Sequence, residues 1–301
     1  MLEGTGLKQV DKRFPKRIFD VGVAEQHAVT MAAGMARGGL RPVVAIYSTF
    51  LQRSYDQILH DVCLQELPVV IGVDRAGLVG EDGRTHHGIF DIAFMGSLPN
   101  MIMAAPKDEN ELQHLLYTAV NTDKPTSIRY PRGSGYGVAL DKDLHKIRIG
   151  TGEQVREGED LTLVAIGSMV HPALEAAEKI AKEGVECAVV NARFINPLDK
   201  KLILDNASRT GRVLTIEEHM IGGGFGSLVL SLIEKSMPTG AKIKTHGVPD
   251  QFIEHGDRIE LLANLGLNTQ GIILKVKTEF PELFPEAKSG KQLAKTELRQ
   301  S

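Results

Sequence analysis

The chain has 301 residues, of which 42% are hydrophobic and 24% are charged, with a net charge of −3. This composition is typical of a globular protein and argues against a disordered chain. Because the two signs of charge nearly balance, we expect neither a nucleic-acid partner nor binding to an anionic membrane. The length allows one large domain or two medium ones.

The cysteines and the apolar runs indicate the compartment. Cys63 and Cys187 lie far apart in the sequence, which suits a reducing compartment and excludes a disulfide framework or a CxxC metal site. No apolar run approaches the roughly 18 residues of a membrane helix. The opening segment MLEGTGLKQVDKRFPKR lacks the apolar centre of a signal peptide. We therefore expect a cytoplasmic protein.

Short apolar, β-branched runs alternate with helical patterns along the chain. Runs such as Val43–Ile46 and Val69–Ile71 do not alternate with polar residues, which is typical of parallel strands buried on both faces. The predicted strands are Arg17–Val21, Pro42–Tyr47, Pro68–Asp74, Met101–Ala104, Thr126–Tyr130, Leu161–Ile166, Glu186–Asn191, Arg212–Glu217 and Ile243–Gly247. This alternation predicts an α/β fold with mainly parallel sheets covered by helices.

Two predicted helices begin with capping boxes. Thr49 is followed by Gln52, and Asp108 by Glu111, each before apolar residues at helical spacing. Another apolar helical pattern follows Glu25 and ends at Gly38-Gly39.

The segment Pro131–Asp160 is rich in glycine and charge and interrupts the strand–helix rhythm. We place a domain boundary there. The expected organisation is a first domain over 1–140, a linker over 141–160 that could hold a short hairpin, a second domain over 161–285 and a polar tail over 286–301.

Glu25 is the first candidate site residue. It follows a predicted strand and starts a helix, so its carboxylate is expected at the carboxyl edge of a parallel sheet, where ligands bind. A carboxylate that only complements the helix dipole would look the same in sequence.

Tyr47, Phe50 and Arg53 form a second candidate group at the next strand end. Two aromatic rings and an arginine there could build a stacking surface with a cationic edge for a flat ring. A hydrophobic staple beside a solvated arginine is an equally good interpretation of these residues alone.

A long polar loop, RAGLVGEDGRTHHG over 75–88, follows the next predicted strand. It contains Asp82, His86 and His87, and loops this dense in titratable groups and glycine often carry function. Neighbouring histidines point apart and no third ligand stands at motif spacing, so we expect no metal here. Arg75 and Arg132 each follow a strand end and could hold a phosphate, or could pair with surface carboxylates.

The glycine-rich segment 222–227, GGGFGS, precedes a predicted helix. It matches neither GxGxxG nor GxxxxGK[ST]. A tight turn with close helix–sheet packing therefore explains it better than a phosphate site.

Four segments together resemble 1-deoxy-D-xylulose-5-phosphate synthases, thiamine-diphosphate enzymes of the transketolase superfamily. They are DVGVAEQHAVTMAAGMA, YSTFLQRSYDQILHDV, DRAGLVGEDGRTHHGIFD and IRYPRG, and the resemblance runs from about Glu3 to about Phe284. It implies a transketolase-like pyrimidine-binding domain followed by a transketolase C-terminal domain. The implied reaction condenses pyruvate with glyceraldehyde 3-phosphate and releases carbon dioxide. The implied enzyme is a homodimer.

The resemblance also implies roles for single residues. Glu25 matches the glutamate that hydrogen-bonds the aminopyrimidine ring of thiamine and favours its imino tautomer. Phe50 matches the ring that stacks on the pyrimidine, with Arg53 and Tyr47 as neighbours in the pocket. Asp82 and His86 match polar residues at the substrate. The matches to the pair that grips the aldehyde's phosphate are Arg75 and Arg132, with Arg129 as the substitute for Arg132.

One family feature is absent from this sequence. The superfamily holds the diphosphate and Mg²⁺ through GDG and a later Asn, and this chain contains no GDG. The resemblance therefore implies a missing N-terminal half, a missing first strand of the pyrimidine-binding domain, and a chain that binds thiamine diphosphate weakly and does not turn over alone. A fragment and one subunit of a split enzyme fit equally well. The alternatives are the β subunit of a 2-oxoacid dehydrogenase and a non-catalytic dimerisation or regulatory module.

Overall fold

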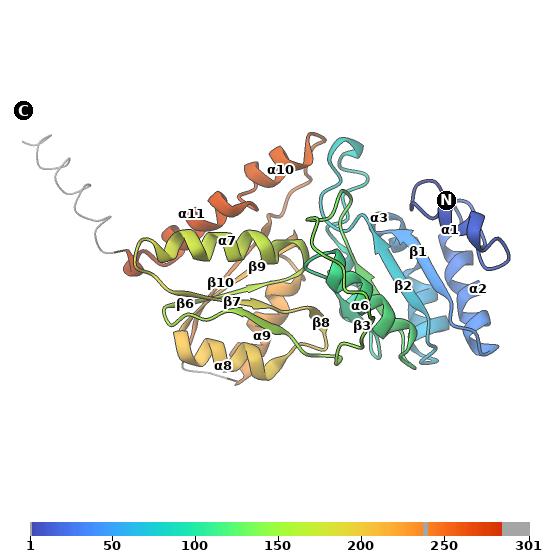
Figure 1. The fold of residues 1–301 in the computed structure, drawn as a ribbon, viewed down its shortest axis with the longest axis horizontal. Helices are drawn as coiled ribbons and strands as arrows, with labels where there is room; N and C mark the ends of the chain where they lie inside the picture. Colours follow the sequence, from blue (N-terminus) through green and yellow to red (C-terminus); the bar gives the residue numbers. More distant parts are fainter. Residues whose placement is uncertain (1, 237–239, 285–301) are drawn as a thin grey trace, which may run out of the picture.

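Two five-stranded sheets organise the protein in a computed structural model, which describes residues 2–236 and 240–284 (Figure 1). The predicted α/β class with helices on mainly parallel sheets is confirmed. The polar tail expected over 286–301 lies outside the described residues.

The first sheet has the strand order β1-β2-β4-β3-β8. Its strands are β1 (Val43–Tyr47), β2 (Val70–Asp74), β4 (Thr126–Arg129), β3 (Ile102–Ala104) and β8 (Phe194–Asn196). The first four are parallel, and β8 runs antiparallel to β3. β1 forms one edge of this sheet.

The second sheet has the order β10-β9-β6-β7-β5. Its strands are β10 (Lys242–Val248), β9 (Arg212–Met220), β6 (Leu161–Ala165), β7 (Cys187–Asn191) and β5 (Glu153–Arg156). Only β5 is antiparallel to its neighbour. Burial of β6 and β7 along their whole lengths explains their continuous apolar sequences.

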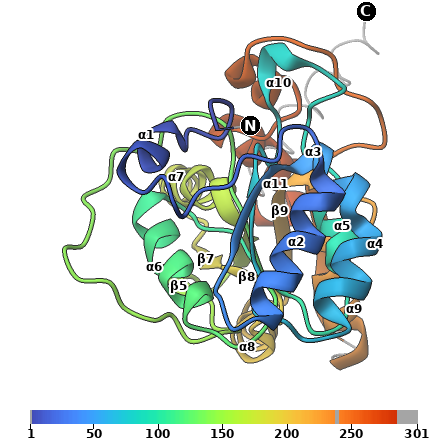
Figure 2. The same ribbon diagram turned by 90° about the vertical axis from the view of Figure 1, so that its right-hand side faces the viewer.

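Helices cover both sheets on two sides (Figures 1 and 2). The α-helices are α1 (Lys8–Arg13), α2 (Glu25–Arg37), α3 (Ser48–Leu51), α4 (Tyr55–Gln57), α5 (Asp91–Met95), α6 (Glu109–Val120), α7 (Val170–Ala181), α8 (Lys200–Thr210), α9 (Phe225–Ser236), α10 (Arg258–Asn264) and α11 (Thr269–Glu279). The short 3-10 helices are η1 (Gln52–Ser54), η3 (Gly80–Asp82), η4 (Gly167–Met169) and η5 (Pro281–Leu283), and η2 (Ile58–Cys63) is a π-helix. On the first sheet, α2 and α6 lie on opposite faces. On the second, α7 and α11 lie opposite α8 and α9.

The predicted helix starts differ in their capping. At α6, Asp108 accepts a hydrogen bond from the Glu111 amide at 2.9 Å, as expected of a capping residue. At α3, the Gln52 side chain donates to the Thr49 carbonyl at 2.8 Å instead of capping an amide. The helical stretch after Tyr47 then passes through α3, η1, α4 and η2 rather than forming one regular helix.

One strand assignment from the sequence is wrong, and two strands of the structure lie outside the predicted ones. The predicted strand Arg17–Val21 does not form, because Asp20 accepts a hydrogen bond from the Gly22 amide at 2.9 Å and turns the chain. The polar stretch predicted as linker contains β5, and β8 was not predicted. Both missed strands are short and antiparallel, and long-range pairing rather than local pattern defines them.

One apolar cluster joins the two sheets. It includes Ile71 of β2, Val164 of β6 and Phe225 of α9, all buried. The packing between the two sheets is therefore continuous.

Candidate active site

Three neighbouring strands of the first sheet end together, and candidate residues follow them. Tyr47, the last residue of β1, is in register with Asp74, the last of β2. In β4, Arg129 is in register with Val73 of β2. The segment that begins with Arg75 therefore leaves the sheet at its carboxyl edge, where open α/β sheets bind ligands.

Glu25 lies at the start of α2 and is only 6% exposed. Its Oε2 is 3.5 Å from Nη1 of Arg53, which comes from η1. The carboxylate therefore lies between the amino end of α2 and the guanidinium of Arg53. Glu25 also lines a cavity of about 1020 Å³, so its carboxylate does more than complement the dipole of α2.

Aromatic side chains continue the site from Glu25. The rings of Tyr47 and Phe50 stack with centroids 5.4 Å apart, and the His86 ring meets Phe50 edge-on at 5.3 Å. The guanidinium of Arg53 lies 5.3 Å from the Phe50 ring centre. Tyr47 and Phe50 also line the cavity, so both rings lie at its wall.

Arg75, Asp82 and Arg132 meet at the other end of the aromatic surface. Arg75 ion-pairs with Asp82, and Nη1 of Arg132 lies 2.7 Å from the same Asp82 oxygen. Arg75 also stacks over Tyr47, 3.9 Å from the ring centre. The two arginines predicted as a phosphate grip therefore share one carboxylate. Burial raises the pKa of Tyr47, which keeps its hydroxyl protonated beside them.

The backbone at Arg75 is unusual. Its φ of 56° lies in the left-handed region that non-glycine residues rarely adopt. Its amide donates to Asp74 Oδ1 at 2.7 Å, and the next amide, of Ala76, donates to the Tyr130 carbonyl at 2.9 Å. Strained backbone conformations of this kind are characteristic of functional sites. At this site the strained residue, Arg75, is the one that ion-pairs with Asp82.

Two histidines in the 75–88 loop point in different directions. His86 faces Phe50, whereas His87 is buried and accepts from the Val79 amide at 3.1 Å. The other ring nitrogen of His87 is 3.1 Å from the Glu254 carbonyl. His87 therefore shapes the loop, while His86 belongs to the site surface.

Arg129, the substitute considered for Arg132, lies elsewhere. It is buried, and its Nε donates to Asp91 at 2.7 Å while Nη2 donates to the Glu218 carbonyl at 3.2 Å. The structure thus brings Arg132, and not Arg129, to Arg75 and Asp82. Sequence spacing alone could not separate two arginines three positions apart.

The glycine-rich segment 222–227 surrounds a protein carboxylate. Glu217 accepts hydrogen bonds from the amides of Phe225 and Gly226, at 2.6 and 2.8 Å, where α9 begins. A Cβ at Gly224 would stand 2.3 Å from Glu217 Oε2. The tight turn expected there is confirmed, and burial raises the pKa of Glu217 to about 8.

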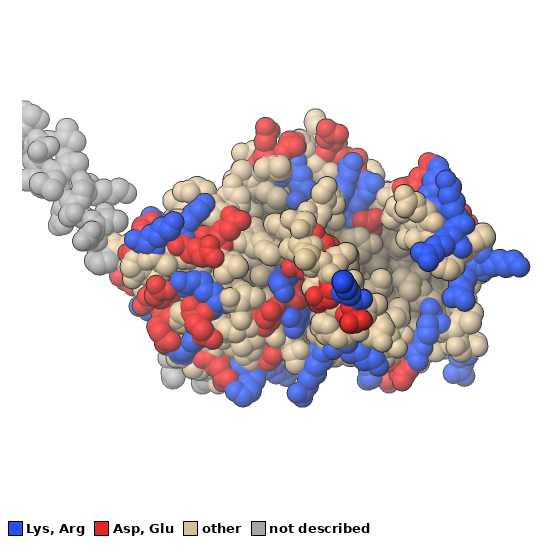
Figure 3. Space-filling model, in the orientation of Figure 1, with Lys and Arg blue, Asp and Glu red and all other residues tan. Residues whose placement is uncertain are grey.

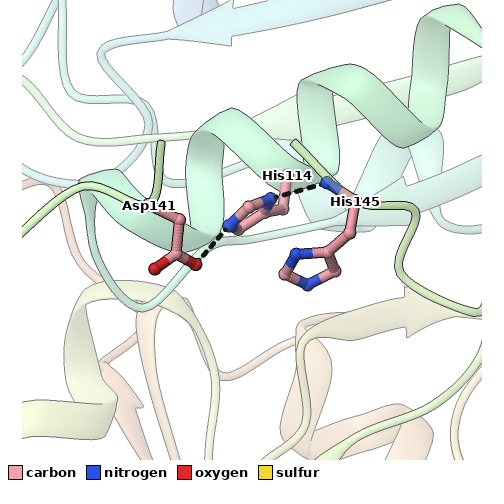
Figure 4. A group of neighbouring side chains, drawn as sticks. All are labelled: His114, Asp141 and His145. Carbon is pink, nitrogen blue, oxygen red and sulfur yellow. Dashed lines mark hydrogen bonds and ion pairs between the residues drawn. The ribbon is translucent and has the colours of Figure 1, made fainter. Parts of the chain in front are cut away.

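A second titratable cluster lies away from this site, where His114 of α6 meets Asp141 and His145 of the segment after β4 (Figure 4). His114 Nε2 is 2.8 Å from Asp141 Oδ2, and His114 Nδ1 accepts from the His145 amide at 3.3 Å. An acceptor Nδ1 places the proton of neutral His114 on Nε2, where it bonds the carboxylate instead of offering a lone pair to a metal. The cluster fastens the segment after β4 to α6.

The cavity beside Glu25 runs along the outer part of the first sheet. Its lining includes Val44 and Ile46 of β1, Gly72 of β2, Met31 of α2 and Leu116 of α6. In Figure 3 the molecule is hollowed between the N-terminal segment at the right and the middle of the view, and the floor of the hollow is mostly uncharged. The site therefore combines a mostly apolar wall with a charged end.

Chemically, these residues can hold a flat heterocycle and an anionic group. A buried carboxylate and an aromatic face suit a protonatable ring, and paired guanidiniums suit a phosphate. None of the helices in residues 2–236 and 240–284 is long and apolar enough to cross a membrane.

Comparisons with known proteins agree with this geometry. Residues 1–136 match the family model for the transketolase pyrimidine binding domain, and residues 150–272 match that for the transketolase C-terminal domain. The chain is 54% identical over 286 residues to 1-deoxy-D-xylulose-5-phosphate synthase of Halothermothrix orenii, covering 94% of this chain and 45% of the relative. It is 56% identical over 278 residues to synthase 1 of Geobacter metallireducens, covering 92% and 44%. The chain thus spans less than half the length of these curated relatives.

Solved structures give the same fold. A protein described as "Split gene transketolase, inactive beta4 tetramer" superimposes with a TM-score of 0.80 at 31% identity, covering 91% of this chain and 89% of that one. Transketolase from Campylobacter jejuni gives a TM-score of 0.70 at 20% identity, covering 86% of this chain and 39% of that chain, which supports the fold alone.

Proposed function

Since this chain belongs to the transketolase family, we propose that it supplies the pyrimidine-binding and substrate-binding side of a 1-deoxy-D-xylulose-5-phosphate synthase. The complete enzyme would condense pyruvate with glyceraldehyde 3-phosphate and release carbon dioxide. The observation that carries the proposal is the unbroken run of contacts from Glu25 through Arg53, Phe50, Tyr47 and Arg75 to Asp82 and Arg132. Relatives that are 52–56% identical and carry this enzyme's name support it.

The residues at the cavity fit the pyrimidine end of thiamine diphosphate. Glu25 would hydrogen-bond a nitrogen of the aminopyrimidine ring, and Arg53 would keep the carboxylate in place. The Phe50 ring would stack on the pyrimidine. When bound, the cofactor's thiazolium supplies the electron sink for decarboxylation of pyruvate.

The charged end of the site fits the aldehyde substrate. Arg75 and Arg132 would donate hydrogen bonds to the phosphate of glyceraldehyde 3-phosphate, because guanidinium groups bind phosphate in this way. Asp82 forms ion pairs with both guanidiniums through the same carboxylate oxygen, and these contacts would fix their orientation. His86, edge-on to Phe50, would add a polar ring beside the bound substrate.

The proposed enzyme also needs a partner half. We assign Mg²⁺ and the cofactor's diphosphate to the part of the relatives' length that this chain does not span. That half would pack beside the edge strand β1 and cover the mostly apolar cavity of about 1020 Å³ next to Glu25, with the pyrimidine held between the two halves. The name of the solved relative, an inactive β4 tetramer of a split-gene transketolase, supports a chain that is inactive by itself.

Two other functions predict different results. A 2-oxoacid dehydrogenase β subunit would pass an acyl group to lipoamide and would not need Arg75 or Arg132 for a phosphate. A dimerisation or regulatory module would not need Glu25 or Phe50. The contacts among all of these residues favour the synthase.

The choice of acceptor substrate tests the proposal. The chain would be mixed with an N-terminal half of a synthase and supplied with thiamine diphosphate, Mg²⁺, pyruvate and either glyceraldehyde 3-phosphate or lipoamide. Formation of 1-deoxy-D-xylulose 5-phosphate with the aldehyde alone is the expected result. Acyl transfer to lipoamide would identify a dehydrogenase subunit, and a stable complex without either product would identify a scaffold.

A further inference from the structure

The loop over residues 75–88, which carries Asp82, packs against α10 on the side of the molecule formed by the second sheet. Figures 1 and 2 place this loop, residues 75–88, beside α10, and η3 within it contacts α10. The Gly256 amide donates to the Gly80 carbonyl at 3.4 Å, and Arg84 ion-pairs with Glu254. A part of the chain remote in sequence therefore supports the loop.

Glu218 of β9 is the buried centre of this support, with 1% of its surface exposed. Its Oε1 accepts from the Leu78 amide at 2.8 Å, and its Oε2 accepts from the Ser168 hydroxyl at 2.7 Å. A Cβ at Gly77, whose φ is +91°, would stand 2.5 Å from the Glu218 carboxyl carbon. Only glycine can bring the loop backbone this close to the carboxylate.

Arg258, at the start of α10, completes the support. Its Nη2 lies 2.9 and 2.6 Å from the two Glu218 oxygens, and its Nε donates to the Leu78 carbonyl at 3.0 Å. Both polar groups of the Leu78 backbone are thus bonded by these two side chains. The ion pair is buried at Glu218 and partly exposed at Arg258, so the carboxylate is both neutralised and hydrogen-bonded.

The next peptide unit connects this support to the candidate site. The Val79 carbonyl accepts from Arg132 Nη1 at 3.1 Å, and the same nitrogen bonds Asp82. Leu78 therefore faces Glu218 and Arg258, while its neighbour Val79 faces Arg132. A shift of this short backbone segment would move Asp82 and release Arg132 together.

We propose that Glu218 and Arg258 are positioning residues that set the geometry of Arg75, Asp82 and Arg132 through the backbone of Leu78 and Val79. The substrate part of this inference rests on the proposed function, in which those arginines bind the aldehyde's phosphate. In the described residues, neither Glu218 nor Arg258 is a hydrogen-bond or ion-pair partner of the Arg75, Asp82 or Arg132 side chains. Their effect on phosphate binding would be exerted through preorganisation of the loop.

The loop part of the inference is tested on the chain alone. Amide hydrogen exchange would be followed at Leu78 in wild type, Glu218→Ala, Glu218→Gln and Arg258→Met. We expect exchange at Leu78 to accelerate at least about tenfold in Glu218→Ala and in Arg258→Met. Glu218→Gln should show a smaller change, because its amide oxygen still accepts from Leu78.

Two further variants keep this test interpretable. Ser168→Ala removes a partner of the same carboxylate without touching the loop backbone, so Leu78 exchange should stay as in wild type. Arg258→Lys keeps a positive charge beside Glu218 and loses the Nε hydrogen bond to the Leu78 carbonyl. Exchange at Leu78 in this variant therefore tests the inference even if Glu218→Ala does not fold. Unchanged exchange at Leu78 in every folded Glu218 and Arg258 variant would overturn the inference.

The substrate part is tested in the chain mixed with an N-terminal synthase half. Arg258→Met should raise KM for glyceraldehyde 3-phosphate about tenfold, with kcat and KM for pyruvate changed less than about twofold. A merely structural role would lower all of these together. Faster exchange at Leu78 with an unchanged KM for the aldehyde would overturn the positioning role. Failure of the proposed function would look different: wild type would make no product after mixing, although Leu78 exchange still depended on Glu218.

Discussion

Arg75 lies over the ring of Tyr47, 3.9 Å from its centre, and so joins the ends of two neighbouring strands. This contact connects the aromatic surface near Glu25 with the arginines at Asp82. The pyrimidine of the cofactor and the phosphate of the aldehyde would therefore bind to one continuous surface in the proposed enzyme.

Phe50 should dominate whatever affinity the chain alone has for the cofactor. The described contacts favour the pyrimidine ring, so we expect thiamine and thiamine diphosphate to bind the isolated chain within about threefold of each other. Phe50→Ala should weaken both about tenfold, because aromatic stacking contributes roughly 1 kcal/mol beyond buried area. Isothermal titration calorimetry measures these affinities. A diphosphate preference of more than about a hundredfold would place the anchor for that group on this chain.

The two neighbouring arginines should differ in their effect on stability. Arg129→Ala leaves Asp91 buried without its partner, so the free energy of unfolding should fall by about 3–5 kcal/mol. Arg132→Ala removes an exposed ion pair and should change it by less than about 1 kcal/mol. Urea denaturation of both variants checks this contrast. Equal losses would mean that Arg132, too, is mainly structural.

The sequence predicts the parts of this protein that local pattern determines. Buried parallel strands such as β2 and β7 appear as apolar runs, and the Asp108 cap of α6 follows from its spacing to Glu111. The candidate residues at strand ends also follow from the rule that ligands bind at the carboxyl edge of such sheets.

Long-range contacts were beyond the sequence. No local pattern predicts β8, because it completes the first sheet from a later part of the chain. The burial of Arg129 likewise depends on Asp91 and on the Glu218 carbonyl. The role of Glu218 at Leu78 joins positions 140 residues apart. No spacing motif reports such a pair.

The glycine-rich turn offers a matched pair of substitutions. In Gly224→Ala the new Cβ would stand 2.3 Å from Glu217 Oε2 and from the Met220 carbonyl, whereas at Gly222 it would meet nothing within 4 Å. We expect Gly224→Ala to lower the free energy of unfolding by about 2 kcal/mol or more. Gly222→Ala should change it by less than about 0.5 kcal/mol. Similar values from chemical denaturation would show that the turn does not enclose Glu217 tightly.

His219 should make the stability depend on pH. Burial lowers its pKa from 6.5 to about 4, and Nε2 accepts from the Ile92 amide at 3.1 Å. Between pH 6.5 and pH 4, His219 is protonated in the unfolded chain and stays neutral in the folded chain. The free energy of unfolding therefore falls as the pH drops toward 4, by about 3 kcal/mol in all from this residue.

Comparison with His219→Gln isolates that effect. Glu217 nearby acts in the opposite sense, because burial raises its pKa to about 8 and the folded chain takes up its proton first. The variant retains Glu217 and lacks the titrating ring. Its stability should therefore fall less than that of wild type between pH 6.5 and pH 4 in urea denaturation. Parallel curves for the two proteins would contradict a buried neutral His219.

Carbon dioxide release from pyruvate, with glyceraldehyde 3-phosphate, thiamine diphosphate and Mg²⁺, is the most direct measurement. It would be made on this chain alone, on the chain mixed with an N-terminal synthase half, and on the mixture with Glu25→Ala. We predict no carbon dioxide release from the chain alone and release on mixing. Glu25→Ala should lower the rate of release from the mixture at least about a hundredfold. Release from the chain alone, or undiminished release with Glu25→Ala, would contradict a half-enzyme that works through Glu25.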